Sequence, residues 1–346
     1  MDAAEPLALI GGTGSPYTRK MLALLRYRRI PYAIRWGDPA AILDQLGVEK
    51  PRPVFHPTFL MPGGDGVRAT CDSTPIIRDL EQRYSGRSVI PSDPALDFIN
   101  FLVEDFGDEW CTKYMFHYRW YPQEDADNAG TLLPLSMHLD MPEEMHSQFK
   151  AAFAERQINR LYVVGSNDVT APVIDASYRR FLAAMERCIS ESPFLLGARP
   201  AACDYAIFGQ LTQLVGFDPT PRAIAHELAP RTVAWVGVME DLSGLAPGDE
   251  QWNAIGDLGE GLHDLLCEIG RVYVPALLAN AQALEAGEKT WETTIDGATW
   301  TQQTFPYQGK CLRWINEKYR ALEPEDRQRV DTVLAGTGCE AVILPA

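Results

Sequence analysis

The first ninety residues alternate between short apolar runs and amphipathic helical repeats. Strands are expected where the apolar run is short, and helices where apolar positions recur every three or four residues. The predicted elements are a strand over 7–10, a helix over 16–29, a strand over 32–36, a helix over 40–47, a strand from 56, a hairpin strand over 67–71 and a helix from 72 to 84. The order β-α-β-α-β-β-α indicates an α/β domain.

The pattern beyond residue 88 is mainly helical. Residues 88–94 contain two prolines and predict a linker, after which one long amphipathic helix is expected over 95–120. Residues 122–150 are rich in Pro, Asp, Glu and Met, and we expect an irregular loop with one short helix there. The apolar positions of 178–188 again repeat at helical spacing, so this region is predicted to be an all-α domain.

The last hundred residues carry a different mixture of elements. After a turn-rich break at 243–248, residues 253–286 predict helix that Pro275 kinks or divides. Residues 291–295 and 298–301 then meet across Asp296-Gly297, a signal for a type I′ hairpin, and helices are expected over 310–322 and from 324. Residues 288–346 contain six aromatic residues, which are too much apolar surface for a disordered tail. They are Trp291, Trp300, Phe305, Tyr307, Trp314 and Tyr319.

Charge and cysteine content narrow the function classes. The chain of 346 residues has a net charge of −16, but residues 1–90 carry a balance of +3 and the remainder −19. This acidity argues against nucleic acid as a partner. No apolar run is long enough to span a membrane and the first five residues lack the basic start of a signal peptide, so we expect a cytoplasmic protein. The seven cysteines are scattered without a C-x-x-C, which predicts reduced thiols and no metal site.

The segment 12–20, between the first strand and the first helix, is the main candidate for chemistry. Ser15 is a favoured helix cap directly before Pro16, which suits the first helical position. A hydroxyl there could also stabilise an anion such as a thiolate, because a helix N-terminus offers free N–H groups and a positive dipole end. A dinucleotide site is disfavoured, because Tyr17 stands where the third glycine of that fingerprint belongs.

Three landmarks resemble those of the cytosolic glutathione transferases. They are Ser15-Pro16-Tyr17 at the first helix, Pro57 before the third strand, and Asp72-Ser73 before the third helix. The stretch 193–205 resembles that family's entrance to its central helix, although Ala201 replaces the usual capping hydroxyl and leaves Asp204 a folding role. The resemblance runs to about residue 242. It implies a thioredoxin-like domain over 1–88 and a helical substrate domain over 89–242. Residues 243–346 lie beyond the resemblance and form an unusual extension, which we expect to pack on the helical domain.

The resemblance also implies a glutathione site. Ser15 would donate a hydrogen bond to the glutathione sulfur, with Tyr17 as a second catalytic candidate. The main chain of His56, before a cis Pro57, would pair with the cysteinyl part. Asp72 would pair with the γ-glutamyl ammonium and Ser73 would bind the neighbouring carboxylate, as their charges and donors allow. The candidates for binding the glycyl carboxylate are Lys50 and Arg52.

The second, apolar substrate would lie against the long helix that follows the linker. Polar-tipped rings suit a half-wet pocket, and Trp110, Tyr114 and His117 near the far end of that helix are our candidates. The extension could narrow this pocket as a cover over the cleft mouth, or it could be a structural buttress on the outer face.

Together these points predict a glutathione transferase-like enzyme that activates the glutathione thiolate for attack on an apolar electrophile. Glutathione is the expected cosubstrate, no metal is required, and a homodimer with a detoxification role is implied by the resemblance. A non-catalytic interaction protein on the same fold is the alternative. A glutathione-dependent reductase or peroxidase ranks lower, because hydroxyl residues stand at 15 and 18 where a reductase would use a cysteine. The electrophile and the reaction type stay open.

Overall fold

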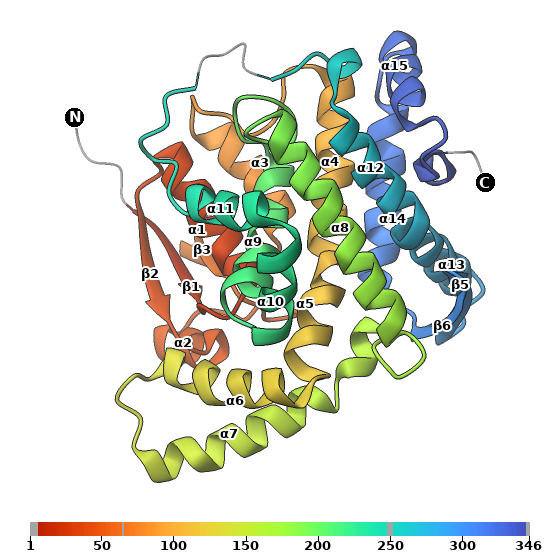
Figure 1. Cartoon of the computed structure of the whole chain (residues 1–346). Helices are drawn as coiled ribbons and strands as arrows, with labels where there is room; N and C mark the ends of the chain where they lie inside the picture. Colours follow the sequence, from red (N-terminus) through yellow and green to blue (C-terminus); the bar gives the residue numbers. More distant parts are fainter. Residues whose placement is uncertain (1–5, 64–65, 248–251, 344–346) are drawn as a thin grey trace.

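The computed structural model describes residues 6–63, 66–247 and 252–343, so the tip of the predicted turn at 62–66 and part of the break at 243–248 lie outside the described residues (Figure 1). Its N-terminal part is built on a mixed sheet with strand order β2-β1-β3-β4. β1 and β2 are parallel, whereas β3 is antiparallel to both β1 and β4. The elements are β1 (Leu7–Gly11), α1 (Pro16–Arg28), β2 (Tyr32–Trp36), α2 (Pro39–Leu46), β3 (Thr58–Gly63), β4 (Gly66–Thr70) and α3 (Ser73–Arg83).

The two faces of this sheet have separate apolar contacts. Leu9 and Phe59 belong to the large core that also contains α1 and α3 side chains such as Leu25 and Ile77. Ile10 faces the other way and packs with Leu43 of α2. The alternation of side chains along β1 therefore places α1 and α3 on one face and α2 on the other, as the predicted thioredoxin-like fold requires.

The second part of the chain is helical, as expected. α9 lies at its centre, and nearly all of its side chains are buried. The elements are α4 (Pro94–Glu109), α5 (Cys111–Trp120), α6 (Gln123–Met137), α7 (Glu143–Ile158), η1 (Leu161–Val164), α8 (Ala171–Glu191), α9 (Ala202–Gly216), α10 (Pro219–Leu228) and α11 (Pro230–Met239).

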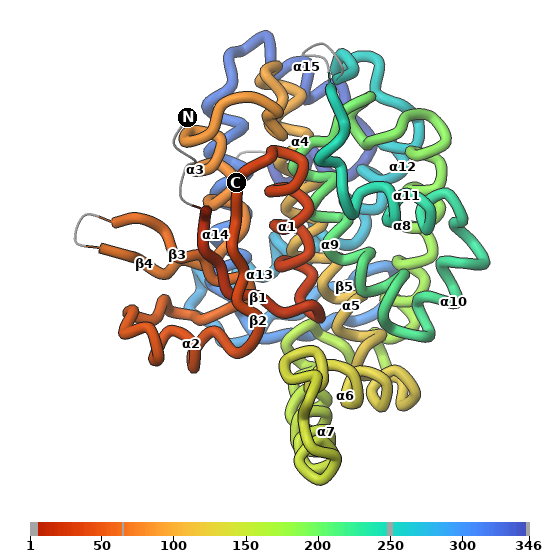
Figure 2. The backbone as a smooth tube through the Cα atoms, turned by 90° about the vertical axis from the view of Figure 1, so that its left-hand side faces the viewer, coloured from red at the N-terminus to blue at the C-terminus, as the bar shows by residue number. Residues whose placement is uncertain are grey.

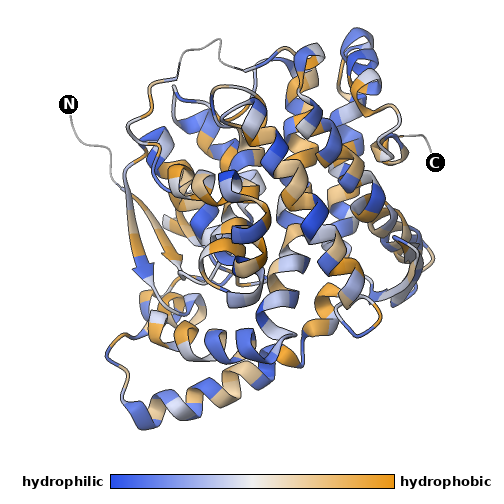
Figure 3. Cartoon of the chain, in the orientation of Figure 1, coloured by the Kyte–Doolittle hydropathy of each residue, from blue (hydrophilic) through white to orange (hydrophobic). Residues whose placement is uncertain are grey.

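Two details of the helical prediction are wrong. The helix expected over 95–120 is interrupted at Trp110, which separates α4 from α5. The loop expected over 122–150 consists instead of two long helices, α6 and α7, which project together from the body (Figure 2). Their first turns hold the acidic residues that the composition showed, and carboxylates there favour the helix dipole. Hydrophilic and hydrophobic colours are mixed along the exposed α7 in Figure 3, so no continuous apolar stripe revealed this helix.

The C-terminal extension is an integral part of the fold. α12 packs along α8, while α14 and α15 pack along α4 (Figure 1). The predicted hairpin is confirmed, with positive φ of 50° at Asp296 and 82° at Gly297 as a type I′ turn requires. The elements are η2 (Ile255–Asp257), α12 (Glu260–Glu268), η3 (Ile269–Tyr273), α13 (Val274–Glu285), β5 (Thr290–Ile295), β6 (Ala298–Gln303), α14 (Pro306–Arg320), α15 (Pro324–Leu334) and η4 (Cys339–Val342). The division of the chain at residues 88 and 242 stays a prediction.

The sheet part and the helical part meet at the crossing of α1 and α9. Gly209 of α9 lies so close to α1 that a Cβ atom there would come within 2.5 Å of the main-chain oxygen of Pro16 and 3.0 Å of Lys20 Cβ. A side chain at this position would force apart the two helices, because the nearest atom is main chain and cannot turn away.

Replacement of Gly209 tests this contact. We expect Gly209→Ala to lower the free energy of unfolding by about 1–3 kcal/mol through overpacking. The matched control is Gly216→Ala, at the end of the same helix, where a Cβ meets no atom within 4 Å. The control should leave stability unchanged or raise it by up to ~1 kcal/mol, since alanine is the better helix former. Equal urea midpoints for the two variants would contradict the close crossing.

Candidate functional site

Ser15 caps the start of α1, where the chain leaves β1. Its Oγ accepts a hydrogen bond from the Thr18 N–H at 3.2 Å and donates to the main-chain oxygen of His56 at 3.4 Å. An O–H···O bond is normally 2.5–3.0 Å long, so the bond to His56 is weak and the hydroxyl can turn towards a stronger acceptor. The Thr18 hydroxyl is buried and accepts from the Gly12 N–H, which gives it a structural role in the same loop.

His56 and Pro57 lie directly opposite Ser15. The bond between them is cis, as the resemblance implied. The His56 ring lies against Gly12 and its Nε2 donates to the main-chain oxygen of Gly37 at 2.8 Å. The ring is therefore occupied in holding neighbouring loops together, and the predicted role of His56 uses its main chain.

Asp72 and Ser73 form the start of α3, beside the same loop. Cys71 accepts a hydrogen bond from the Phe55 N–H at 3.4 Å, which joins the Asp72 segment to the segment before Pro57. Asp72 has φ 83°, a conformation that costs a non-glycine residue roughly 1–3 kcal/mol and is concentrated at functional sites. All three landmarks predicted from the sequence are thus brought together at one edge of the sheet.

Lys20 is the residue of this region that sequence reasoning missed. It is 1 % exposed, and its Nζ donates to Ser73 Oγ at 3.0 Å, Glu104 Oε1 at 3.0 Å and Asp108 Oδ2 at 2.6 Å. Burial alone would lower the pKa of Lys20, but Asp108 and Glu104 outweigh it and the pKa is raised, so the lysine is charged. Its position one helical turn before Leu24 was the available signal, because a lysine on the apolar face of a helix needs partners.

Residues of the helical part hold the loop before Ser15 in place. Arg119 donates to the main-chain oxygen of Gly14 at 2.8 Å, and Gln213 donates to that of Thr13 at 3.3 Å. Arg119 is itself fixed by a buried ion pair with Asp218 at 2.9 Å. The position of the Ser15 hydroxyl therefore depends on α5 and α9 as well as on α1.

The structure corrects the catalytic role predicted for Tyr17. Its hydroxyl turns towards α4 and donates to the main-chain oxygen of Asp108 at 2.7 Å. Burial, with Glu109 and Asp108 nearby, raises the pKa of Tyr17 well above its usual value, so it stays protonated. Tyr17 therefore joins the two parts of the fold and does not face the Ser15 site.

The three rings proposed for the second-substrate pocket are core residues. Trp110 and Tyr114 are fully buried, the first against Tyr273 and Trp300 and the second bonded to Ser177 at 2.7 Å. Neither ring lines an open pocket, because Trp110 is covered by Tyr273 and Trp300 of the extension, whereas Tyr114 packs against Tyr178 and Phe181 of α8. His117 is also buried, with Nδ1 at 2.7 Å from Ser166 Oγ, and burial lowers its pKa to about 4.

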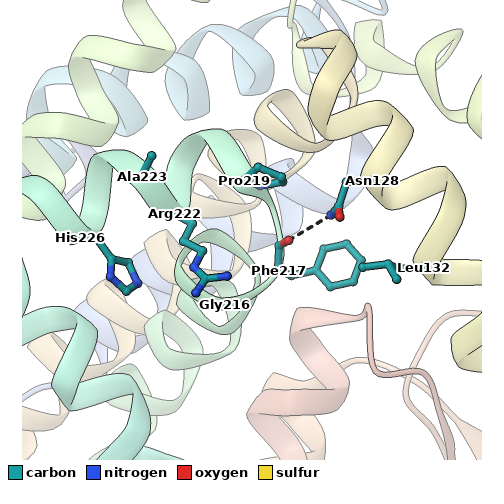
Figure 4. Close-up of a pocket in the computed structure, with 8 residues that line it drawn as sticks. All are labelled: Asn128, Leu132, Gly216, Phe217, Pro219, Arg222, Ala223 and His226. Atoms are coloured by element: carbon teal, nitrogen blue, oxygen red, sulfur yellow. Dashed lines mark hydrogen bonds between the residues drawn. The ribbon is translucent and has the colours of Figure 1, made fainter.

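Two surface hollows lie away from these rings. One is bordered by α6, the end of α9 and α10, where the Asn128 side chain donates to the main-chain oxygen of Phe217 at 3.1 Å beside Arg222 and His226 (Figure 4). None of the residues that we predicted lines it. The other includes Lys50 and Arg52, with Lys50 paired to Asp44 at 2.7 Å. In the part of the chain that the structure describes, no three side chains of His, Cys, Asp or Glu are grouped to hold a metal ion, and no helix could span a membrane.

Comparison with known proteins identifies the N-terminal part. Residues 9–88 match the family model of the glutathione S-transferase N-terminal domain. This stretch is therefore similar to a glutathione S-transferase N-terminal domain. The whole chain has the corresponding architecture, with a thioredoxin-like domain followed by a helical region. A search of curated proteins found no match to the sequence.

Several solved structures are similar to part of this chain at low sequence identity. FzlA from C. crescentus is 14% identical and has a TM-score of 0.42 over 72% of this chain and 96% of that one. A glutathione S-transferase from Methylobacterium radiotolerans, solved with glutathione sulfonate, is 17% identical with a TM-score of 0.40 over 72% and 98%. A Tau class glutathione S-transferase from mango is 17% identical and has a TM-score of 0.39 over 72% of this chain and 96% of that one.

The extension covers a group of carboxyls on α4. Asp105 accepts a hydrogen bond from the Tyr273 hydroxyl at 2.6 Å, and Glu109 lies 3.4 Å from the Gln308 amide of α14. Burial, reinforced by the neighbouring carboxylates, raises the pKa of Asp105 to about 7 and that of Glu109 to about 8. Near neutral pH the fold therefore favours the protonated form of Glu109.

This arrangement predicts how stability varies with pH. Because the pKa of Glu109 is higher in the folded chain than in the unfolded chain, its contribution is complete below about pH 4.5 and is lost as the pH rises through about 8. We expect Glu109→Gln to be more stable relative to wild type at pH 8 than at pH 5, measured by urea unfolding. The control is Glu288→Gln at an exposed position. A stability difference that is the same at both pH values would contradict the assignment.

Proposed function

We propose that the protein binds glutathione along Ser15, His56, Pro57, Asp72 and Ser73 and activates its thiol for attack on an apolar electrophile. The observation that carries this proposal is that Ser15 Oγ contacts the main chain of His56 beside the Asp72 segment, within a stretch that matches the glutathione S-transferase N-terminal domain. Glutathione is thus the proposed cosubstrate, and a cytoplasmic homodimer with a detoxification role stays part of the proposal.

Activation follows from the position of the Ser15 hydroxyl. A free thiol with a pKa near 8.5 is only a few per cent ionised at pH 7, and a decrease of about two units requires ~2.7 kcal/mol. A hydrogen bond to a charged group contributes about 1.5–3 kcal/mol, and the helix N-terminus adds to it. Ser15 can supply this bond, because its present bond to His56 is long and weak.

A non-catalytic protein on the same fold is the second candidate. The observation that favours it is that both rings proposed to face an electrophile are buried, Trp110 under the extension and Tyr114 against α8. Calorimetry separates the two, since absence of glutathione binding at millimolar concentration would leave only the non-catalytic candidate.

Replacement of the proposed activator gives the direct test. Ser15→Ala should leave the glutathione Kd within about threefold, while turnover with an activated aryl halide falls roughly 10- to 100-fold through loss of one charged hydrogen bond. The apparent pKa of the pH–rate profile should rise by one to two units, for the same reason.

Tyr17→Phe is the matched control for this prediction. It removes a hydroxyl two residues away whose hydrogen bond goes to Asp108. Its pH–rate profile should stay that of the wild type. If Tyr17→Phe shifts the profile and Ser15→Ala does not, Ser15 is not the activator.

A further inference from the structure

The extension reaches the start of α3, where the proposed glutathione site ends. Lys310 Nζ of α14 lies 3.8 Å from Asp72 Oδ2. Burial raises the pKa of Asp72, whereas the nearby Tyr307 side chain and Lys310 lower it. Both Lys310 and Tyr307 belong to α14 of the extension and not to the N-terminal domain. The region around Asp72 is therefore completed by residues from the other end of the chain.

The ammonium group of Lys310 is only loosely held by Asp72. A separation of 3.8 Å is too long for a hydrogen bond, and the Lys310 side chain is 37% exposed. Its position is set by two rings of the same helix, with Nζ at 4.0 Å from the centre of the Trp314 ring and 5.3 Å from that of Tyr307. The rings orient the ammonium group without using its hydrogen-bond donors, which stay available to a ligand.

The other cation beside this site, Lys20, already uses its hydrogen-bond donors within the protein. Lys20 Nζ has three donors and three partners, namely Ser73, Glu104 and Asp108. A ligand carboxylate that approached Asp72 would face these buried acidic groups from the side of α4. It would need a second positive charge to bind there, and Lys310 is placed to provide it.

We propose that Lys310 is a specificity-determining residue that binds the α-carboxylate of the γ-glutamyl group, while Asp72 binds its α-ammonium. This inference rests on the proposed function. An α-amino acid head group carries opposite charges on neighbouring substituents of one carbon. A lysine and an aspartate 3.8 Å apart present the complementary pair, and the bound head group would replace their loose contact by two charge-assisted hydrogen bonds.

Calorimetry on the full chain with two ligands tests this assignment. The first ligand is glutathione, and the second is its analogue with γ-aminobutyryl in place of γ-glutamyl, which lacks only the α-carboxylate. Lys310→Met should weaken glutathione binding at least tenfold and leave the Kd of the analogue unchanged. Lys310→Arg should restore most of the affinity, because it keeps the charge.

Arg313→Met is the control, since it removes one positive charge from an exposed position of the same helix and should change neither Kd. If a folded Lys310→Met variant binds glutathione as tightly as the wild type or more tightly, this proposal alone is overturned. Tighter binding would show that Lys310 blocks access to Asp72. Equal weakening of both ligands would also overturn it, because the lost interaction would not involve the carboxylate. Absence of glutathione binding by the wild type would overturn the proposed function itself.

Discussion

The fold and the candidate site both depend on the buried ammonium group of Lys20. It connects the first helix, the start of α3 and the carboxylates of α4 through three bonds of 2.6–3.0 Å. An ion buried this deeply is tolerated only when its partners are in place, and removal of one partner typically costs about 3–5 kcal/mol. The two parts of the protein therefore cannot separate without exposing this charge to water or leaving it buried without its partners. The hydroxyl of Ser73, which belongs to the proposed glutathione site, is one of the hydrogen-bond partners of Lys20.

The extension adds a further layer to the same arrangement. It covers α4 and α5 with its own apolar groups, such as Trp300, and with polar groups that meet buried charges, as where Gln302 accepts from Lys113 at 2.9 Å. Matching of this kind distinguishes a permanent part of the core from a tail that docks loosely, because each buried polar atom needs its partner. The extension therefore combines features of the two predicted roles. Its hairpin packs on α5, as expected of a buttress, and α14 reaches Asp72 beside the proposed glutathione site.

Local patterns in the sequence were sufficient for the sheet domain and for the hairpin. The alternation over 32–36 and the Asp296-Gly297 pair depend on neighbours in the chain, and both elements formed where they were expected. The three landmarks of the site could be found because the resemblance rests on short motifs. Lys20 and Lys310 could not be assigned in this way, since their partners lie 53 to 238 residues away in the sequence. Trp110 was misjudged for a related reason, because the extension residues that bury it, Tyr273 and Trp300, have no counterpart in the resemblance.

The same long-range contacts determine how the site can work. The loop carrying Ser15 is held at Thr13 and Gly14 by Gln213 and Arg119, so the hydroxyl is positioned from the helical side. Asp72, at the opposite end of the site, is met by α14 of the extension. A ligand lying between Ser15 and Asp72 would therefore contact groups fixed by all three parts of the chain. Catalytic positioning tolerates errors of only a fraction of an ångström, so the N-terminal domain alone, although it holds every landmark, would not maintain this geometry.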